Sequence, residues 1–198
     1  SLSYKYEGII KIPDSFKGYS IITENKTKLY TQELNGNTYC QISIPPLSFT
    51  NFHKGEKQKN QTRERLNFFL ENEFVKYKFS KNGNLIFGLD KELNKNLLSS
   101  PGNILSLYED RPLNWDAWDI DFYYKESLLE TAKVSKIHKV KFGSIFSYLE
   151  IEYTIGNSKI KQLITLSNQS KRLDFNTTVN WNEKHKMLRV HFPTNIIS

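Results

Sequence analysis

Apolar and polar residues alternate over most of the second half of the chain. Every second residue is apolar over 149–155, the dipeptide Gly156-Asn157 offers a turn, and the alternation resumes over 160–166, 173–181 and 188–192. A period of two places the apolar side chains on one face of a β-strand. The pattern predicts a series of antiparallel strands, each with one buried face, that stack as a β-sandwich.

Asn-Gly dipeptides mark two further hairpins, because both residue types tolerate the positive φ of a two-residue turn. Asn35-Gly36 precedes a stretch in which Cys40, Ile42 and Ile44 share a face. Asn82-Gly83 separates two alternating runs, and the return run is expected to bury Leu85, Phe87 and Leu89. Helix is scarce in this sequence. Its only candidates are two short segments, 66–72 and 125–132.

The sequence between the two sets of hairpins changes character. Pro45-Pro46 stops the preceding strand, since proline cannot donate to a sheet ladder. Residues 51–65 are polar and basic, which is typical of a solvated linker or a long loop. We therefore expect a small β unit over 1–50, a connector over 51–65 and a larger sandwich domain over 66–198.

The densest chemistry lies in residues 103–124. This stretch holds two of the three tryptophans, five acidic residues and six aromatic rings. Aromatic faces stack on the C–H faces of a sugar, and carboxylates accept hydrogen bonds from its hydroxyls. The run Trp115-Asp116-Ala117-Trp118-Asp119-Ile120-Asp121 is expected to form an irregular loop, because as a strand it would place Trp115, Asp119 and Asp121 on one face.

Several interpretations of this loop remain open. It could contact a saccharide, or it could be a structural corner in which Trp115 packs and an aspartate caps a turn. Two of its acids could form a glycosidase pair, but sequence proximity does not set the separation of roughly 5–10 Å that such a pair needs. A calcium site is less favoured, since the spacing lacks the glycine and terminal glutamate of a helix-loop-helix site.

The bulk composition restricts the possible partners. The chain has 198 residues, which suffice for a sizeable core, and a formal net charge of +7. The basic residues are scattered, so a nucleic-acid partner is not expected. No apolar run is long enough for a membrane span, and a membrane partner is not expected either. Cys40 is the only cysteine, which excludes an internal disulfide and favours a reducing compartment. The only methionine is Met187, so we expect that the chain was processed or belongs to a longer protein.

The residue types of metal and nucleophilic sites are not gathered in sequence. None of the four histidines has a close histidine or cysteine companion, so no metal site is predicted within this chain. His185 is expected in a polar turn, bonded to Glu183. Nucleophilic catalysis by a serine triad or by Cys40 is not predicted, because the chain has no Ser-His-Asp ordering and Cys40 has no nearby histidine, and a phosphate-binding glycine loop is lacking too.

Several ordered motifs resemble the β-sandwich region of α-mannosidases of glycoside hydrolase family 38, in particular the cytosolic and vacuolar branch. The resemblance covers about residues 66–198, and the first 50 residues are only loosely similar to the small β domain that precedes this region. Asn180 and Asn182 depart from the family pattern, in which an aspartate and a histidine are usual. The motifs are Leu70-Glu71-Asn72-Glu73-Phe74, Asp90-Lys91-Glu92, Leu107 to Pro112, Trp115 to Asp119, Val179 to Leu188 and His191-Phe192-Pro193.

The resemblance implies a mainly β chain with a mutarotase-like supersandwich that continues beyond Ser198. It also implies that the divalent metal, of zinc or cobalt type, and the catalytic groups belong to an N-terminal barrel that this chain lacks. Trp118 matches a position at the rim of the family's active-site cleft. Trp115, Asp116, Asp119 and Asp121 are then expected to shape the loop or to meet the barrel.

We therefore expect a non-catalytic sandwich from a retaining α-mannosidase, in which this loop forms one side of a cleft for mannose-containing oligosaccharides. The alternative is a stand-alone carbohydrate-binding module, which would bind mannose without the barrel. The expected location is cytoplasmic.

Overall fold

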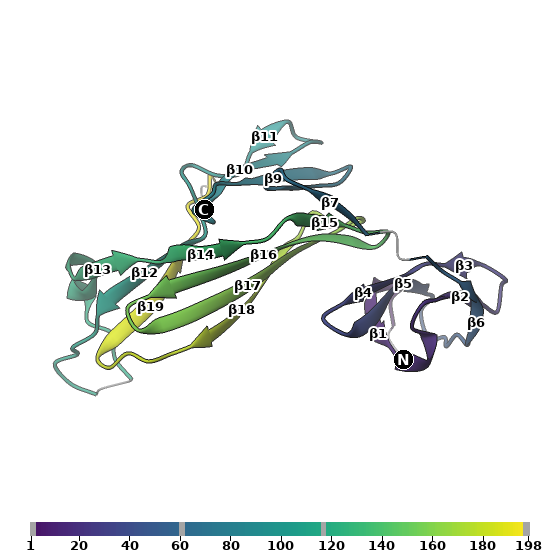
Figure 1. Ribbon diagram of the computed structural model, residues 1–198, viewed down its shortest axis with the longest axis horizontal. Coiled ribbons are helices and arrows are strands. Elements are labelled where there is room, and N and C mark those ends of the chain that lie inside the picture. The colour runs from purple at the N-terminus through teal and green to yellow at the C-terminus, as the bar shows by residue number, and fades with distance from the viewer. Residues whose placement is uncertain (1–2, 60–61, 116–117, 196–198) are drawn as a thin grey trace. The chain divides into compact units, whose positions relative to one another are not determined.

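The computed structural model describes residues 3–59, 62–115 and 118–195, and these fold into two compact units. Unit 1 comprises residues 1–64 and 141–146, and unit 2 comprises residues 65–140 and 147–198. The chain passes from one unit to the other within three strands, β7 (Arg63–Arg65), β15 (Val140–Phe142) and the first residues of β16 (Phe146–Ile155). The prediction of a mainly β chain built from antiparallel sheets is confirmed (Figure 1).

Unit 1 contains two three-stranded antiparallel sheets around a small apolar core of Ile12, Ile21, Cys40 and Ile42. The predicted Asn35-Gly36 turn is confirmed, with φ of 49° and 79° at its two residues. The first sheet has the order β1 (Tyr6–Ile12), β5 (Asn37–Ile44), β4 (Thr31–Leu34), and the second has the order β3 (Lys28–Leu29), β2 (Tyr19–Thr23), β6 (Phe52–Lys57); the 3-10 helix η1 spans Asp14–Phe16.

The predicted linker is wrong for strand β6, which pairs with β2 from Thr23↔Phe52 to Tyr19↔Lys57. Phe52 packs against the unit 1 core, and backbone pairing with β2 holds the rest of this otherwise polar strand. The 141–146 segment also belongs to unit 1. The buried Gln32 side chain donates to the Phe146 carbonyl at 2.9 Å and accepts from the Ile145 amide at 2.9 Å.

Unit 2 contains three groups of antiparallel strands. In one of them the long strands β16, β17 and β18 are neighbours, and β14 also pairs with β16 (Figure 1). This group is β14 (Lys133–Ile137), β16 (Phe146–Ile155), β17 (Ser158–Ser167) and β18 (Leu173–Asn180). The others are β11 (Lys95–Asn96), β10 (Leu85–Asp90), β9 (Val75–Phe79), β8 (Phe69–Glu71), and β13 (Leu128–Thr131), β12 (Ile104–Glu109), β19 (Lys186–His191).

The alternation predicted for β16 and β17 is confirmed by their burial. Leu149, Ile151 and Ile164 have no exposed surface, and the Ile155 and Ile160 side chains are 1% and 2% exposed. Burying such side chains contributes about 1.5–3 kcal/mol each, which fixes the register of both strands. Strand β18 differs, because Val179 stays 38% exposed although the pattern predicts a buried face.

Two other predictions in unit 2 are wrong. A register shift between Leu85 and Phe87 in the β9–β10 hairpin changes the buried face. Gly88 and Asp90 are buried, whereas Phe87 and Leu89 are only partly buried. Both helix candidates also fail. The segment 66–72 contains β8, and the segment 125–132 contains the end of the 3-10 helix η2 (Phe122–Glu126) followed by β13.

Candidate functional site

The predicted irregular loop is the connection between β12 and β13, residues 110–127. Strand β12 is held on both sides, by β19 from Ile104↔His191 to Glu109↔Lys186 and by β13. The base of the connection is closed by two hydrogen bonds, because the Glu109 amide donates to the Ser127 carbonyl at 3.0 Å and the Ser127 hydroxyl donates to the Glu109 carbonyl at 3.1 Å. The sheet thus fixes both ends of a long connection.

Backbone hydrogen bonds shape the tip of this connection. Trp115 adopts a left-handed φ of 57°, and its carbonyl accepts from the amides of Trp118 at 2.9 Å and Asp119 at 3.0 Å. The Asp121 carboxylate accepts from the Leu113 amide across the loop at 2.8 Å. The Trp115 carbonyl and the Asp121 carboxylate thus accept hydrogen bonds from within the connection, while Asp116 lies outside the residues that the structure describes.

The aromatic rings of the connection face solvent. Trp118 is 88% exposed and Trp115 is 76% exposed. The Trp115 side chain does not pack against the described residues, whereas the Asp121 and Asp119 carboxylates accept backbone amides as the alternative interpretation of a structural corner expects. Further exposed apolar side chains of the same connection are Leu113, Ile120, Phe122 and Tyr123. Because exposed apolar patches of this kind mark binding surfaces, the connection is the candidate site.

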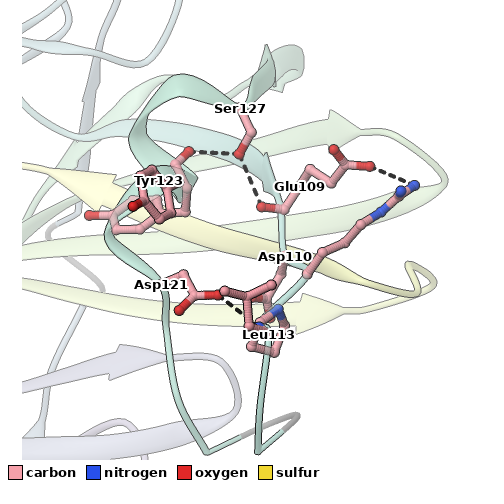
Figure 2. A pocket seen from close by; sticks show the side chains of 9 residues that line it. Glu109, Asp110, Leu113, Asp121, Tyr123 and Ser127 are labelled. Carbon is pink, nitrogen blue, oxygen red and sulfur yellow. Dashed lines mark hydrogen bonds and ion pairs between the residues drawn. The ribbon is translucent and has the colours of Figure 1, made fainter.

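A pocket of about 310 Å³ opens beside the base of the connection (Figure 2). Its volume is at the lower end of the range for small-molecule sites. In Figure 2, Tyr123 and Glu109 lie on opposite sides, with Asp110, Asp121 and Leu113 below them. The residues that line it are Glu109, Asp110, Arg111, Pro112, Leu113, Asp121, Tyr123, Tyr124 and Ser127. Of the predicted site residues that the structure describes, only Asp121 lines this pocket, whereas Trp115, Trp118 and Asp119 do not. Sequence reasoning missed Tyr123 and Arg111, which stand close to the acids in sequence.

Tyr124 anchors the connection to the sheet. The Tyr108 ring packs edge-on against the Tyr124 ring, with centroids 5.4 Å apart. The Arg189 guanidinium lies 4.7 Å from the centroid of the same ring and also donates to the Tyr124 hydroxyl. The Tyr108 hydroxyl in turn lies 3.2 Å from Nε2 of His191. Tyr124, which lines the pocket, is therefore held in place by side chains of β12 and β19 that lie outside the pocket lining.

The pocket combines carboxylates with aromatic surface. The Glu109 carboxylate, which lines the pocket, pairs with the Arg111 guanidinium at 2.8 Å. Asp119 lies outside the pocket lining, and its carboxylate accepts from the Ile120 amide at 2.9 Å. Carboxylate oxygens can accept hydroxyl hydrogens while a ring face stacks on C–H groups, which is the chemistry of polyol recognition. The arrangement can bind a sugar, and it assigns a proton-transfer role to none of its described carboxylates.

A second cluster combines His138 with Glu150 and Glu152. The His138 Nε2 atom lies 3.3 Å from the Glu150 carboxylate and 3.2 Å from the Glu152 carboxylate. The hydrogen bond with His138 is the largest cause that lowers the pKa of the Glu152 carboxyl. His138 directly follows β14 whereas both glutamates lie on β16, so the histidine has no close companion in sequence. The alternation that puts Glu150 and Glu152 on one face was the available signal.

The structure also describes the surroundings of Cys40 and Glu183, two residues that the sequence analysis singles out. Cys40 is a buried free thiol, and burial raises its pKa to about 11. Glu183 does not pair with His185 as expected. Its carboxylate instead accepts from the Asn157 amide and the Ser158 hydroxyl and pairs with Lys186 at 2.8 Å.

No helix in the described part of the chain has the length and apolar character needed to cross a membrane.

Comparison with known proteins gives similarities to α-mannosidases. Residues 70–198 match the model of the glycosyl hydrolases family 38 C-terminal domain. The chain is 29% identical to α-mannosidase G of Dictyostelium discoideum over 213 residues, which cover 94% of the chain and 19% of that protein. It is 32% identical to an α-mannosidase of Saccharomyces cerevisiae, covering 54% of the chain and 10% of that protein. It is 35% identical to mouse α-mannosidase 2C1, covering 49% of the chain and 10% of that protein.

The chain thus spans a fifth or less of the length of these relatives. The family model covers well over half of the chain. The chain belongs to glycoside hydrolase family 38, and residues 70–198 correspond to the C-terminal domain of that family.

Proposed function

We propose that this chain is the non-catalytic β-sandwich region of a retaining, metal-dependent α-mannosidase that hydrolyses terminal α-mannosides. The connection 110–127 forms one side of its substrate cleft, and Trp118 contacts the sugar. The observation that carries the proposal is an 88% exposed tryptophan, at the tip of a sheet-anchored loop, inside the segment that matches the family model. An exposed ring contributes little to folding, and Trp118 belongs to a connection in which Leu113, Ile120, Phe122 and Tyr123 are also exposed, as expected of a surface that contacts a ligand or another domain.

The catalytic groups are placed outside this chain. Relatives named as α-mannosidases extend far beyond the matched segment, and a barrel N-terminal to this region in the same protein holds the nucleophile, the acid and a divalent metal of zinc or cobalt type. Trp115, Asp119 and Asp121 support the loop in this arrangement. Asp121 is already used by the Leu113 amide, which suits a structural carboxylate better than a reacting one.

The test uses the complete protein encoded by the open reading frame that contains this sequence, with an aryl α-mannoside as substrate. We expect Trp118→Ala to raise KM about 2- to 10-fold, the loss of one aromatic stacking contact of about 0.5–1.5 kcal/mol. The matched control is Phe49→Ala, which removes an 83% exposed ring from unit 1 and leaves KM unchanged. Equal KM values for wild type and Trp118→Ala would refute the role of Trp118. Turnover by the purified 198-residue chain would refute the non-catalytic assignment.

A stand-alone carbohydrate-binding module is the second candidate. It is favoured by one observation, that both the pocket and the exposed rings are built from this chain alone. Mannose or mannobiose would then quench the tryptophan fluorescence of the purified 198-residue chain, and Trp118→Ala would abolish the effect. An unchanged fluorescence at saturating sugar excludes this candidate and leaves the cleft proposal in place.

We also infer a cytoplasmic location and no nucleic-acid partner. The buried free Cys40 is consistent with a reducing compartment. Many of the lysines pair with nearby acids, as in Lys28–Glu56 and Lys91–Glu71, so the excess charge is partly neutralised on the surface. Retention of the protein on an oligonucleotide column at moderate salt would contradict the second inference.

A further inference from the structure

His138, Glu150 and Glu152 form a compact cluster on the solvent face of β16. Strands β14 and β16 run side by side in unit 2 (Figure 1). Glu150 and Glu152 alternate with the fully buried Leu149 and Ile151, so both carboxylates project from the opposite face. The cluster is partly buried, because the side chains of Glu150, His138 and Glu152 are 18%, 30% and 40% exposed.

Backbone pairing brings the histidine to this face. Strand β14 pairs with β16 through Lys136↔Glu152 and Ile137↔Ile151. The His138 amide then continues the ladder by donating to the Glu150 carbonyl at 2.9 Å. The pairing of these strands thus positions the imidazole beside the two carboxylates, and a metal site requires ligands that are held in this way.

The two spacings from the imidazole nitrogen to the carboxylates match a small cation. Two atoms bound to a tetrahedral ion at about 2.0–2.1 Å lie about 3.3–3.4 Å apart. The His138 Nε2 atom lies 3.3 Å and 3.2 Å from oxygens of Glu150 and Glu152, and the three ligand atoms all lie within 4.8 Å of one another. We propose that His138, Glu150 and Glu152 form a binding site for a zinc-class divalent cation.

The ligand set selects the class of cation. One imidazole nitrogen with two carboxylate oxygens suits zinc and its transition-metal neighbours, whereas calcium takes six to eight oxygens and magnesium keeps an octahedral oxygen shell. Water takes the fourth position. Lys161 contacts the other oxygen of Glu150 at 3.1 Å, which leaves the first oxygen directed at His138. The Lys161 charge also repels the cation, so the affinity is lower than that of a buried structural zinc site.

The test is calorimetric titration of the untagged, EDTA-treated 198-residue protein with Zn²⁺. We expect one ion per chain, with an affinity that falls at least about tenfold in both His138→Gln and Glu152→Gln. Replacing Zn²⁺ with Co²⁺ should give the intense visible absorption of a tetrahedral ion in the wild type and not in the variants.

The controls remove a histidine and a glutamate elsewhere. His53→Gln on β6 and Glu73→Gln before β9 are exposed positions, and both variants should bind Zn²⁺ within about twofold of the wild type. Circular dichroism checks that each variant is folded, and Glu152→Gln, at the most exposed ligand, keeps the test valid if His138→Gln unfolds. Absence of Zn²⁺ binding, equal weakening in the controls, or equal binding of Ca²⁺ and Mg²⁺ would overturn the proposal. Equal weakening in the controls, or equal binding of Ca²⁺ and Mg²⁺, would mean that His138 pairs with the two carboxylates without forming a zinc site.

Discussion

The β16–β17 hairpin and the 110–127 connection of unit 2 differ in the solvent exposure of their apolar side chains. In the hairpin, Leu149, Ile151 and Ile164 are fully buried. In the connection, Trp115 and Trp118 are more than three-quarters exposed. The hairpin therefore uses hydrophobic burial to define the fold, whereas the connection is shaped by backbone and carboxylate hydrogen bonds and keeps its rings available for contact.

Under the proposed function, this difference separates residues that stabilise the domain from residues that contact a ligand or another domain. A mutation in the hairpin is expected to change the free energy of unfolding, and a mutation at the tip of the connection is expected to change binding. Four variants test this separation, measured in the 198-residue chain by urea unfolding with far-ultraviolet circular dichroism.

Ile151→Ala should have the largest effect. Ile151 has no exposed surface, so its truncation removes buried apolar area and leaves a cavity in a β-sheet core. We expect the free energy of unfolding to fall by about 2–5 kcal/mol. Thr154→Ala, at an exposed position of the same strand, is the control and should stay near the wild type. A loss below about 1 kcal/mol for Ile151→Ala would mean that the hairpin core is not what holds unit 2 together.

Gln162→Leu should have the next largest effect. The buried Gln162 amide exchanges hydrogen bonds with the Asn103 amide at 2.9 and 3.1 Å and accepts from the Tyr153 hydroxyl at 3.2 Å. Leucine retains the bulk but leaves buried polar groups unpaired, which costs about 1–3 kcal/mol. An unfolding free energy equal to that of the wild type would show that the network adds no net stability to the hairpin.

Glu183→Gln should have a smaller effect that depends on pH. Lys186, followed by the Asn157 amide, lowers the pKa of the Glu183 carboxyl below its ordinary value of 4.5. The carboxylate therefore stabilises the fold fully above about pH 4.5, and this contribution is lost as the pH falls through the lowered pKa. The wild type should lose stability more steeply than Glu183→Gln on acidification from pH 6 to about pH 3. Parallel curves for the two proteins would contradict this role at the hairpin turn.

Trp118→Ala should have the smallest effect on folding. A ring that is 88% exposed contributes little to burial, so we expect the free energy of unfolding to change by less than about 0.5 kcal/mol. A loss above about 1.5 kcal/mol would place Trp118 in the fold rather than in recognition, and would remove the contrast between the two regions.

The sequence by itself determined the strands of the hairpins and the position of the candidate loop. Alternation over 149–155 and 160–166 is a local signal, because side chains of a strand point to opposite faces whatever the strand packs against. Asn35-Gly36 and Gly156-Asn157 are local for the same reason, since a turn depends on the φ values that its own residues tolerate. The aromatic and acidic residues of 103–124 were visible as composition.

Only the tertiary structure decided which of these patterns end in burial and which distant residues meet. The register shift in β10 turned Asp90 inward, and Phe52 docked β6 onto the unit 1 core against the polar character of its neighbours. The pairing of β14 with β16 brought His138 to Glu150 and Glu152. Such outcomes depend on strand pairing between segments far apart in the chain, where the free energy of burying one side chain outweighs local preference.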